Sequence, residues 1–117
     1  MTGIYKRILR GLTDALDPLY SSVYDLQNAN RDDTVKCTVL CTRSKIYTKG
    51  IEVIKLIKQK KYTELEPLIN RLFRLINIHR NQLYKLTKTK VRVDLKNFVF
   101  LKNLKTLFTL IRGSFLN

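Results

Sequence analysis

Apolar residues recur at steps of three and four along almost the whole chain, which is the spacing of one face of an α-helix. The pattern is clearest over residues 64–88, where one seam is almost wholly apolar: Leu65, Leu68, Leu72, Leu75, Ile76, His79, Leu83 and Leu86. A second line in the same segment is almost entirely polar or basic: Arg71, Arg74, Ile78, Asn81, Lys85 and Lys88. The two lines together predict an amphipathic helix.

The same spacing predicts helices before this segment. Residues 3–16 carry one apolar stripe, and Asp17-Pro18 is typical of an N-cap followed by proline at the first helical position. A second, short helix is therefore expected over residues 18–26. A long helix is expected over residues 34–60, in which Gly50 marks a bend, a break or the close approach of another backbone.

A last helix is expected over about residues 95–112, with Asp94 as its cap and Gly113 as its stop. Its apolar residues occupy more than one side, which favours a subunit interface or a deep core. With 117 residues, the chain is long enough for one core but near the size at which oligomerisation helps. The sequence therefore predicts one all-α domain over residues 1–117, a bundle of four to five helices that forms a homodimer.

Composition narrows the class of protein. Apolar residues make up 44% of the chain, which excludes a disordered basic tail because so apolar a chain can bury enough surface to fold. No run of about 18 uncharged apolar residues occurs, so no integral membrane segment is expected. The first residues lack the features of a signal peptide, and the only cysteines are Cys37 and Cys41. These observations favour a reduced, intracellular protein of the cytoplasm.

The net charge of +14 indicates a polyanionic partner, and its distribution is uneven. Residues 1–33 hold four basic and five acidic residues, whereas residues 34–117 hold 19 basic and four acidic ones. The first segment is thus near neutral, and the second carries the whole excess of positive charge. This asymmetry suggests a structural or self-association segment joined to a binding segment.

Catalysis and metal binding are poorly provided for. The single histidine, His79, lies in an apolar seam, where a core or interface residue with a satisfied hydrogen bond is expected. No Ser–His–acid set and no glycine-rich phosphate loop can be assembled. Cys37 and Cys41 share one helix face, but a structural zinc site needs two further ligands, so we expect two small buried or half-buried residues near a helix contact, or an intersubunit disulfide. We therefore expect no enzyme, no cofactor and no metal.

Basic helix faces are the positive signal. The candidate nucleic-acid contacts are Lys36, Arg43, Lys45, Lys49, Arg71, Arg74, Lys85, Lys88, Lys90 and Arg92. A surface that only keeps a protein soluble normally interleaves both signs of charge, whereas acids are nearly absent from these faces. The pattern therefore predicts contacts with the phosphates of a nucleic acid.

The type of nucleic acid follows from what the sequence lacks. No helix-turn-helix, zinc or basic-zipper arrangement of a major-groove reader is present. Single-strand binders need exposed aromatic platforms, whereas the aromatic residues of this chain fall mainly in apolar stripes. A reader of duplex RNA shape needs only spaced basic and polar side chains along the backbone, so double-stranded RNA is the first choice.

Residues 28–58 hold a polar turn, Arg31-Asp32-Asp33, followed by one long helix that carries Cys41, Lys45, Thr48, Val53 and Leu56. With Ala15 and Tyr24 at compatible offsets upstream, this segment resembles the small helical RNA-silencing suppressors of nodaviruses, which are insect viruses. The resemblance implies a homodimer in the host cell cytoplasm that binds double-stranded RNA without sequence preference along paired long helices. Ser44 and Ile51 stand where that family has positive residues, so Arg43, Lys45 and Lys49 are assigned from the local pattern.

Two other functions fit the same features. A basic bundle can act as an adaptor that binds an acidic surface of another protein. Basic amphipathic helices, such as those over residues 64–88 and 95–112, can also lie in an anionic membrane surface.

Overall fold

A computed structural model describes residues 2–28, 34–88, 93 and 95–116. Within them the chain forms four α-helices, α1 (Thr2–Asn28), α2 (Thr34–Lys58), α3 (Leu65–Lys88) and α4 (Lys96–Phe115), and one short 3-10 helix, η1 (Tyr62–Glu64). No strand occurs in this part of the chain. The all-α prediction is confirmed, with four helices.

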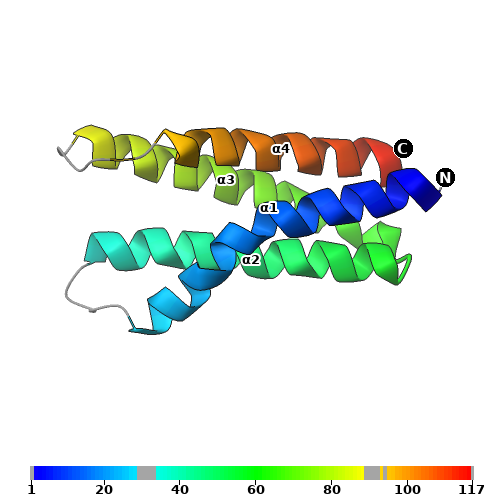
Figure 1. Ribbon diagram of the computed structural model, residues 1–117, viewed down its shortest axis with the longest axis horizontal. Coiled ribbons are helices and arrows are strands. Elements are labelled where there is room, and N and C mark those ends of the chain that lie inside the picture. Colours follow the sequence, from blue (N-terminus) through cyan, green and yellow to red (C-terminus); the bar gives the residue numbers. More distant parts are fainter. Residues whose placement is uncertain (1, 29–33, 89–92, 94, 117) are drawn as a thin grey trace.

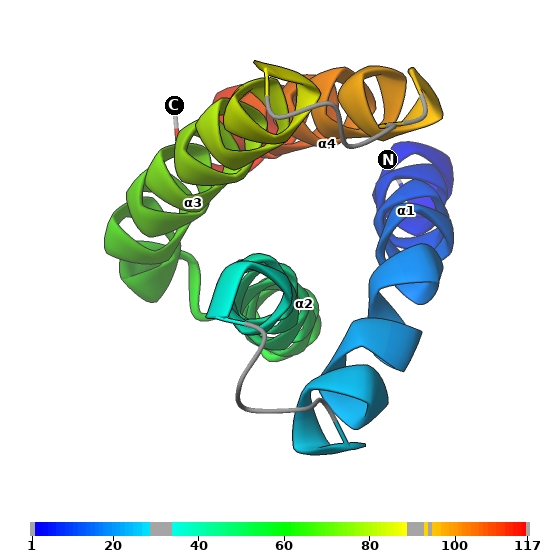
Figure 2. The same cartoon turned by 90° about the vertical axis from the view of Figure 1, so that its left-hand side faces the viewer.

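The helices pack in a ring, α1 on α2, α2 on α3, α3 on α4 and α4 back on α1. Figure 1 shows α2, α3 and α4 side by side along the 47 Å axis of the molecule, with α1 crossing them obliquely. In the end view of Figure 2, α1 lies across the bundle from α3. Each helix buries one stripe, and the largest fully buried side chains are Leu12, Leu16, Leu19, Ile46, Ile57, Leu65, Ile69, Leu72, His79, Leu104, Phe108 and Ile111.

Residues 3–26 were predicted as two helices that meet at Asp17-Pro18, and this prediction is wrong. A single helix, α1, runs through Pro18. Proline removes one backbone donor and usually bends a helix. Here Leu16 and Leu19, on either side of Pro18, belong to the same fully buried stripe, so packing holds the two halves together. Figure 1 shows the second half of α1 descending more steeply than the first.

Gly50 does not break α2, which continues through it to Lys58. A Cβ atom at residue 50 would lie 2.6 Å and 2.7 Å from the two methyl carbons of Leu16. Gly50 therefore gives room to the Leu16 side chain of α1, whereas the sequence had predicted a bend, a break or the close approach of another backbone. The absence of a side chain lets the two helices cross closely.

Helices α2 and α4 end in different ways at their C-termini. Helix α2 ends in a Schellman motif, because Lys61 N donates to Leu56 O and Lys60 N donates to Ile57 O, with Lys60 at a positive φ of 58°. Helix α4 was predicted to stop at Gly113, and this is wrong, because it continues to Phe115. The Phe115 ring stacks on Tyr62 with centroids 5.2 Å apart, which holds the last turn in place. The predicted Asp94 cap lies outside the described residues.

Replacing Gly50 with Ala should destabilise the protein by about 1–2 kcal/mol in urea unfolding. Alanine normally gains about 0.5–1 kcal/mol over glycine inside a helix. The new methyl would overlap Leu16, which is 1% exposed and so could shift only against other core residues, and overpacking costs about 1–3 kcal/mol.

Gly113 provides the matched control. It also lies in a helix, but a Cβ there meets no atom within 4 Å. Gly113→Ala should therefore leave stability unchanged or raise it slightly. Equal effects of the two substitutions would show that the α1–α2 crossing does not require glycine.

Candidate nucleic-acid interface

Helix α3 carries the most regular basic surface of the described chain. Its core-facing seam is buried from Leu65 to Leu83. The opposite side presents an exposed line at alternating steps of three and four: Arg71, Arg74, Ile78, Asn81, Lys85 and Lys88. At a rise of 1.5 Å per residue the line is about 26 Å long. The four basic residues predicted from this segment therefore lie together, and no acid interrupts them.

Helix α2 adds Lys45 and Lys49 beside this line. Gln82 Nε2 donates to Thr42 Oγ1 over 3.0 Å, which sets the register of the antiparallel helices α2 and α3. Lys45 lies three residues beyond Thr42, and Ile78 lies four before Gln82, so the two are level. Lys49 follows Thr42 by two helical turns and shares its side of α2. Lys45 is exposed and Lys49 is half-buried.

We call this surface the α2–α3 basic face. It consists of Lys45, Lys49, Arg71, Arg74, Lys85 and Lys88. Among the described acids, Glu52 follows Lys45 by two turns on α2 and so borders the face at one end. The other described acids lie on α1 or around the start of α3. The face is therefore strongly positive along most of its length.

Three further predicted contacts are not brought to this face. Lys36 is exposed, but it lies nine residues before Lys45, a spacing that puts the two on opposite sides of α2. Lys90 and Arg92 lie outside the described residues. The face thus keeps six of the ten residues predicted from the sequence, and Arg43 has another role.

Arg43 is half-buried and joins three helices instead of facing solvent. Its Nε donates to Ser22 Oγ of α1 over 2.8 Å, and its Nη1 lies 3.5 Å from His79 Nε2 of α3. Ser22 and His79 are 3% and 1% exposed. We therefore assign Arg43 to an interior polar network rather than to the basic face.

The network has a consistent direction of hydrogen bonding. Arginine can only donate, so His79 Nε2 accepts from Arg43 and Nδ1 carries the proton. His79 Nδ1 then donates to Gln82 Oε1 at 3.4 Å, and the amide of Gln82 donates to Thr42. Thr42 donates in turn to the carbonyl oxygen of Thr38. This confirms the expectation that His79 is a core residue with satisfied hydrogen bonds. Because each of these buried polar groups has a partner, their burial leaves no hydrogen bond unmade.

Burial lowers the pKa of His79 from 6.5 to about 4, and the positive charge of Arg43 acts in the same direction. The hydrogen bond to Gln82 opposes the shift. The imidazole is therefore neutral at physiological pH, as its acceptor role toward Arg43 requires.

The hydrogen-bond partners of His79 were not predicted from the sequence. Ser22, Thr42 and Gln82 are polar, and each lies on or next to a core-facing stripe. Three different helices each carry a polar residue on or next to the core-facing stripe. This pattern could have indicated a network, because buried polar groups need hydrogen-bond partners.

A second group of basic residues, also absent from the predicted contacts, lines an open groove between α3 and α4. The groove measures about 590 Å³, and its basic residues are Arg80, Lys102 and Lys105. Its apolar lining includes Ile76 and Leu101, which belong to the core. The groove lies on the side of α3 away from α2.

The described residues offer little for other chemistry. They contain no group of three or more His, Cys, Asp or Glu side chains placed to hold a metal ion. Cys37 and Cys41 are half-buried thiols that form no disulfide within the chain. Among the helices that the structure describes, none has the length and apolar character needed to cross a bilayer.

Comparison with known proteins finds no matching family model, no matching curated protein and no matching solved structure.

Acid should destabilise the fold through His79. The folded pKa of about 4 lies below the ordinary 6.5, so the unfolded chain takes up the proton first as the pH falls. Stability is then lost between about pH 6.5 and pH 4, by about 3 kcal/mol in total for this group. His79→Gln keeps an acceptor for Arg43 and a donor for Gln82 but removes the titration. In urea unfolding at several pH values, the difference between wild type and variant should change across this range, and a constant difference would contradict a neutral, buried His79.

Proposed function

We propose that this protein binds double-stranded RNA without sequence preference by laying the α2–α3 basic face along the phosphate backbone. The observation that carries the proposal is the exposed line from Arg71 to Lys88, which holds four basic residues and no acid. Lys45 and Lys49 of α2 widen it on one side. A straight positive surface of this kind complements a regular array of phosphates.

The energetics favour a polyanion over a single charged group. An exposed ion pair contributes only about 0–1 kcal/mol. A nucleic acid instead releases condensed counterions at each phosphate that a Lys or Arg neutralises, so several such contacts add up. The six residues of the basic face supply this number of contacts on one surface.

Duplex RNA is favoured over other nucleic acids for two reasons. Its wide, shallow minor groove displays 2′-hydroxyls beside the phosphates, and a flat helical surface with polar groups such as Asn81 can contact both. The resemblance of residues 28–58 to nodavirus silencing suppressors points to the same ligand. The proposed role is therefore suppression of RNA silencing, in which bound protein shields the duplex from nucleases that dice it and from proteins that load it. A homodimer, as the sequence predicts, would double the length of the basic face.

Reversing two charges of the face tests the proposal. Arg71→Glu with Arg74→Glu should weaken binding to a mixed-sequence RNA duplex about 100-fold or more in gel-shift titrations at fixed salt. The slope of log affinity against log salt should also fall by about 2, since each lost phosphate contact lowers it by about 1. Helicity by circular dichroism should not change, because both side chains are exposed.

Lys6→Glu with Arg10→Glu is the matched control. It changes the net charge by the same amount, on exposed residues of α1 across the bundle. This variant should keep most of the affinity. Equal losses in the two variants would reduce the proposal to a general effect of net charge, and equal binding of duplex DNA by wild type would contradict the preference for RNA.

A further inference from the structure

The groove between α3 and α4 combines exposed apolar surface with positive charge. Tyr84 and Leu110, which line it, are 51% and 52% exposed. Arg80, Lys102 and Lys105 are exposed, and within the described chain their side chains form no ion pair or hydrogen bond. The groove thus offers apolar contact area and unpaired positive charge at one place.

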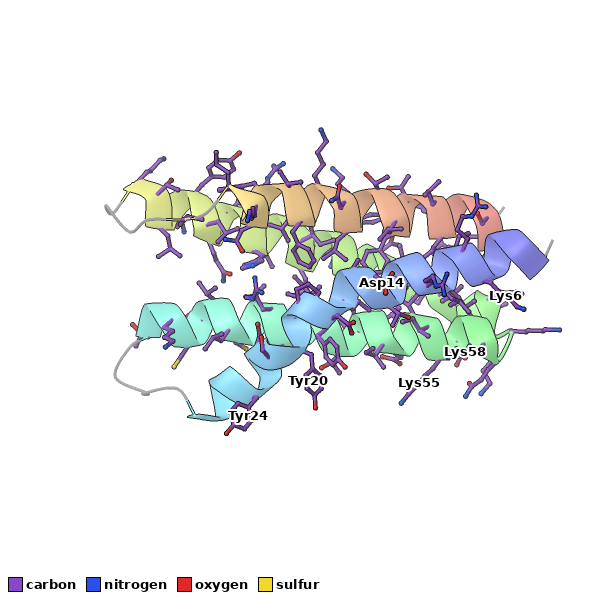
Figure 3. All side chains as sticks on the ribbon, in the orientation of Figure 1. Lys6, Asp14, Tyr20, Tyr24, Lys55 and Lys58 are labelled. Carbon is purple, nitrogen blue, oxygen red and sulfur yellow. The ribbon has the colours of Figure 1, made fainter. Side chains whose placement is uncertain are left out.

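Helix α1 presents two acids in its middle, after the exposed basic residues Lys6, Arg7 and Arg10 of its first turns. Asp14 and Asp17 are exposed, and neither carboxylate is paired within the part of the chain that the structure describes. Tyr20 and Tyr24 follow on the same helix and are 64% and 67% exposed. Figure 3 shows Asp14, Tyr20 and Tyr24 in succession along α1. We call these four residues the α1 acidic face.

The two surfaces match in spacing as well as in charge. Asp14 and Asp17 are three residues apart on α1, and Lys102 and Lys105 are three residues apart on α4. Residues at this spacing lie on the same side of a helix, about one turn apart. An aromatic residue comes next at a similar step on each side, since Tyr20 follows Asp17 and Phe98 precedes Lys102. The order is reversed along the two chains, so the helices would pair antiparallel.

We infer that the α3–α4 groove receives the α1 acidic face of a second copy of this chain. Asp17 pairs with Lys102, and Asp14 pairs with Lys105. Tyr20, whose ring meets that of Tyr47 edge-on with centroids 5.6 Å apart, packs with its exposed side beside the Tyr84–Phe98 ring pair, whose centroids are 4.8 Å apart. The aromatic contact supplies the apolar burial, and the charged pairs set the register, because exposed ion pairs alone contribute little.

Other occupants fit the groove less well. A phosphate backbone has no apolar groups to cover Tyr84 and Leu110. A membrane surface is met by a convex apolar helix face, whereas this surface is a groove between two helices. An acidic helix of another protein has the same chemistry as this part of α1, and association of the purified chain with itself distinguishes the two.

The contact joins different surfaces of the two copies. In Figure 2, α1 lies on one side of the bundle, and the helices α3 and α4 lie at the left and the top. A copy that uses its groove therefore still has its α1 acidic face available for the next copy, and association is heterologous. The net charge of +14 opposes it, so measurements belong at about 0.3 M salt, where the Debye length is below 8 Å.

Sedimentation equilibrium of the full chain without nucleic acid tests this inference separately from RNA binding. Wild type should show a weight-average mass that rises with protein concentration beyond that of a monomer. Asp14→Lys with Asp17→Lys, and Lys102→Glu with Lys105→Glu, should each sediment as a monomer. An equimolar mixture of these two variants should associate again. The lysines introduced on α1 of one variant then meet the glutamates introduced in the groove of the other.

Lys85→Glu with Lys88→Glu is the control, since it matches the charge change of the groove variant but lies on the α2–α3 basic face. It should associate at least as well as wild type. The inference is overturned if wild type remains monomeric up to a concentration on the order of 1 mM. It is also overturned if the mixture stays monomeric, or if the control loses association as fully as the groove variant. Circular dichroism of every variant should match wild type, because all of these side chains are exposed.

Discussion

The register between α2 and α3 is the constraint on which the arrangement of charges depends. It is set by polar contacts in an otherwise apolar interior, where Gln82 donates to Thr42 and Arg43 faces His79. Apolar side chains alone allow neighbouring helices to slide, whereas a buried hydrogen bond is costly to leave unmade. By fixing this register, the network brings Lys45 level with the middle of the basic line on α3 and Lys49 level with Arg74. It also explains why one arginine of so basic a chain is held inside.

Much of the fold follows from the spacing of apolar residues. The seam of α3 from Leu65 to Leu83 and the basic line opposite it follow directly from the sequence, because a helix with one apolar stripe has only one way to face a core. The exposure of Arg71, Arg74, Lys85 and Lys88 is a consequence of the same geometry. The part of the candidate site that lies on one helix could therefore be predicted.

Features that depend on contacts between helices could not be predicted in this way. Pro18 carries a local signal for a helix start, and the shared burial of Leu16 and Leu19 overrides it. Gly113 carries a local signal for a stop, and the stacking of Phe115 on Tyr62 overrides that one. Arg43 has the same spacing as a surface residue, and only the positions of Ser22 and His79 on other helices show that it turns inward. In each case a residue distant in sequence decides the outcome.

The α2–α3 basic face, the α3–α4 groove and the α1 acidic face lie on different parts of the bundle, which suggests that they have separate functions. Helix α3 separates the α2–α3 basic face from the α3–α4 groove, and α1 lies across the bundle from it. RNA bound on the basic face would leave both the groove and the α1 acidic face accessible. Bound RNA would also neutralise the charge that opposes association. Copies held on one duplex could then contact one another, which is what a protein that shields RNA by coverage requires.

Lysine acetylation footprinting on a long RNA duplex tests the central claim most directly, because it reports each lysine separately in the unaltered protein. We predict that RNA protects Lys45, Lys85 and Lys88, all exposed in the free protein, while Lys6, Lys55 and Lys58 remain reactive. Figure 3 shows Lys6 near the start of α1 and Lys55 and Lys58 near the end of α2. Protection of this second group, or uniform protection of all six lysines, would contradict binding through the α2–α3 basic face.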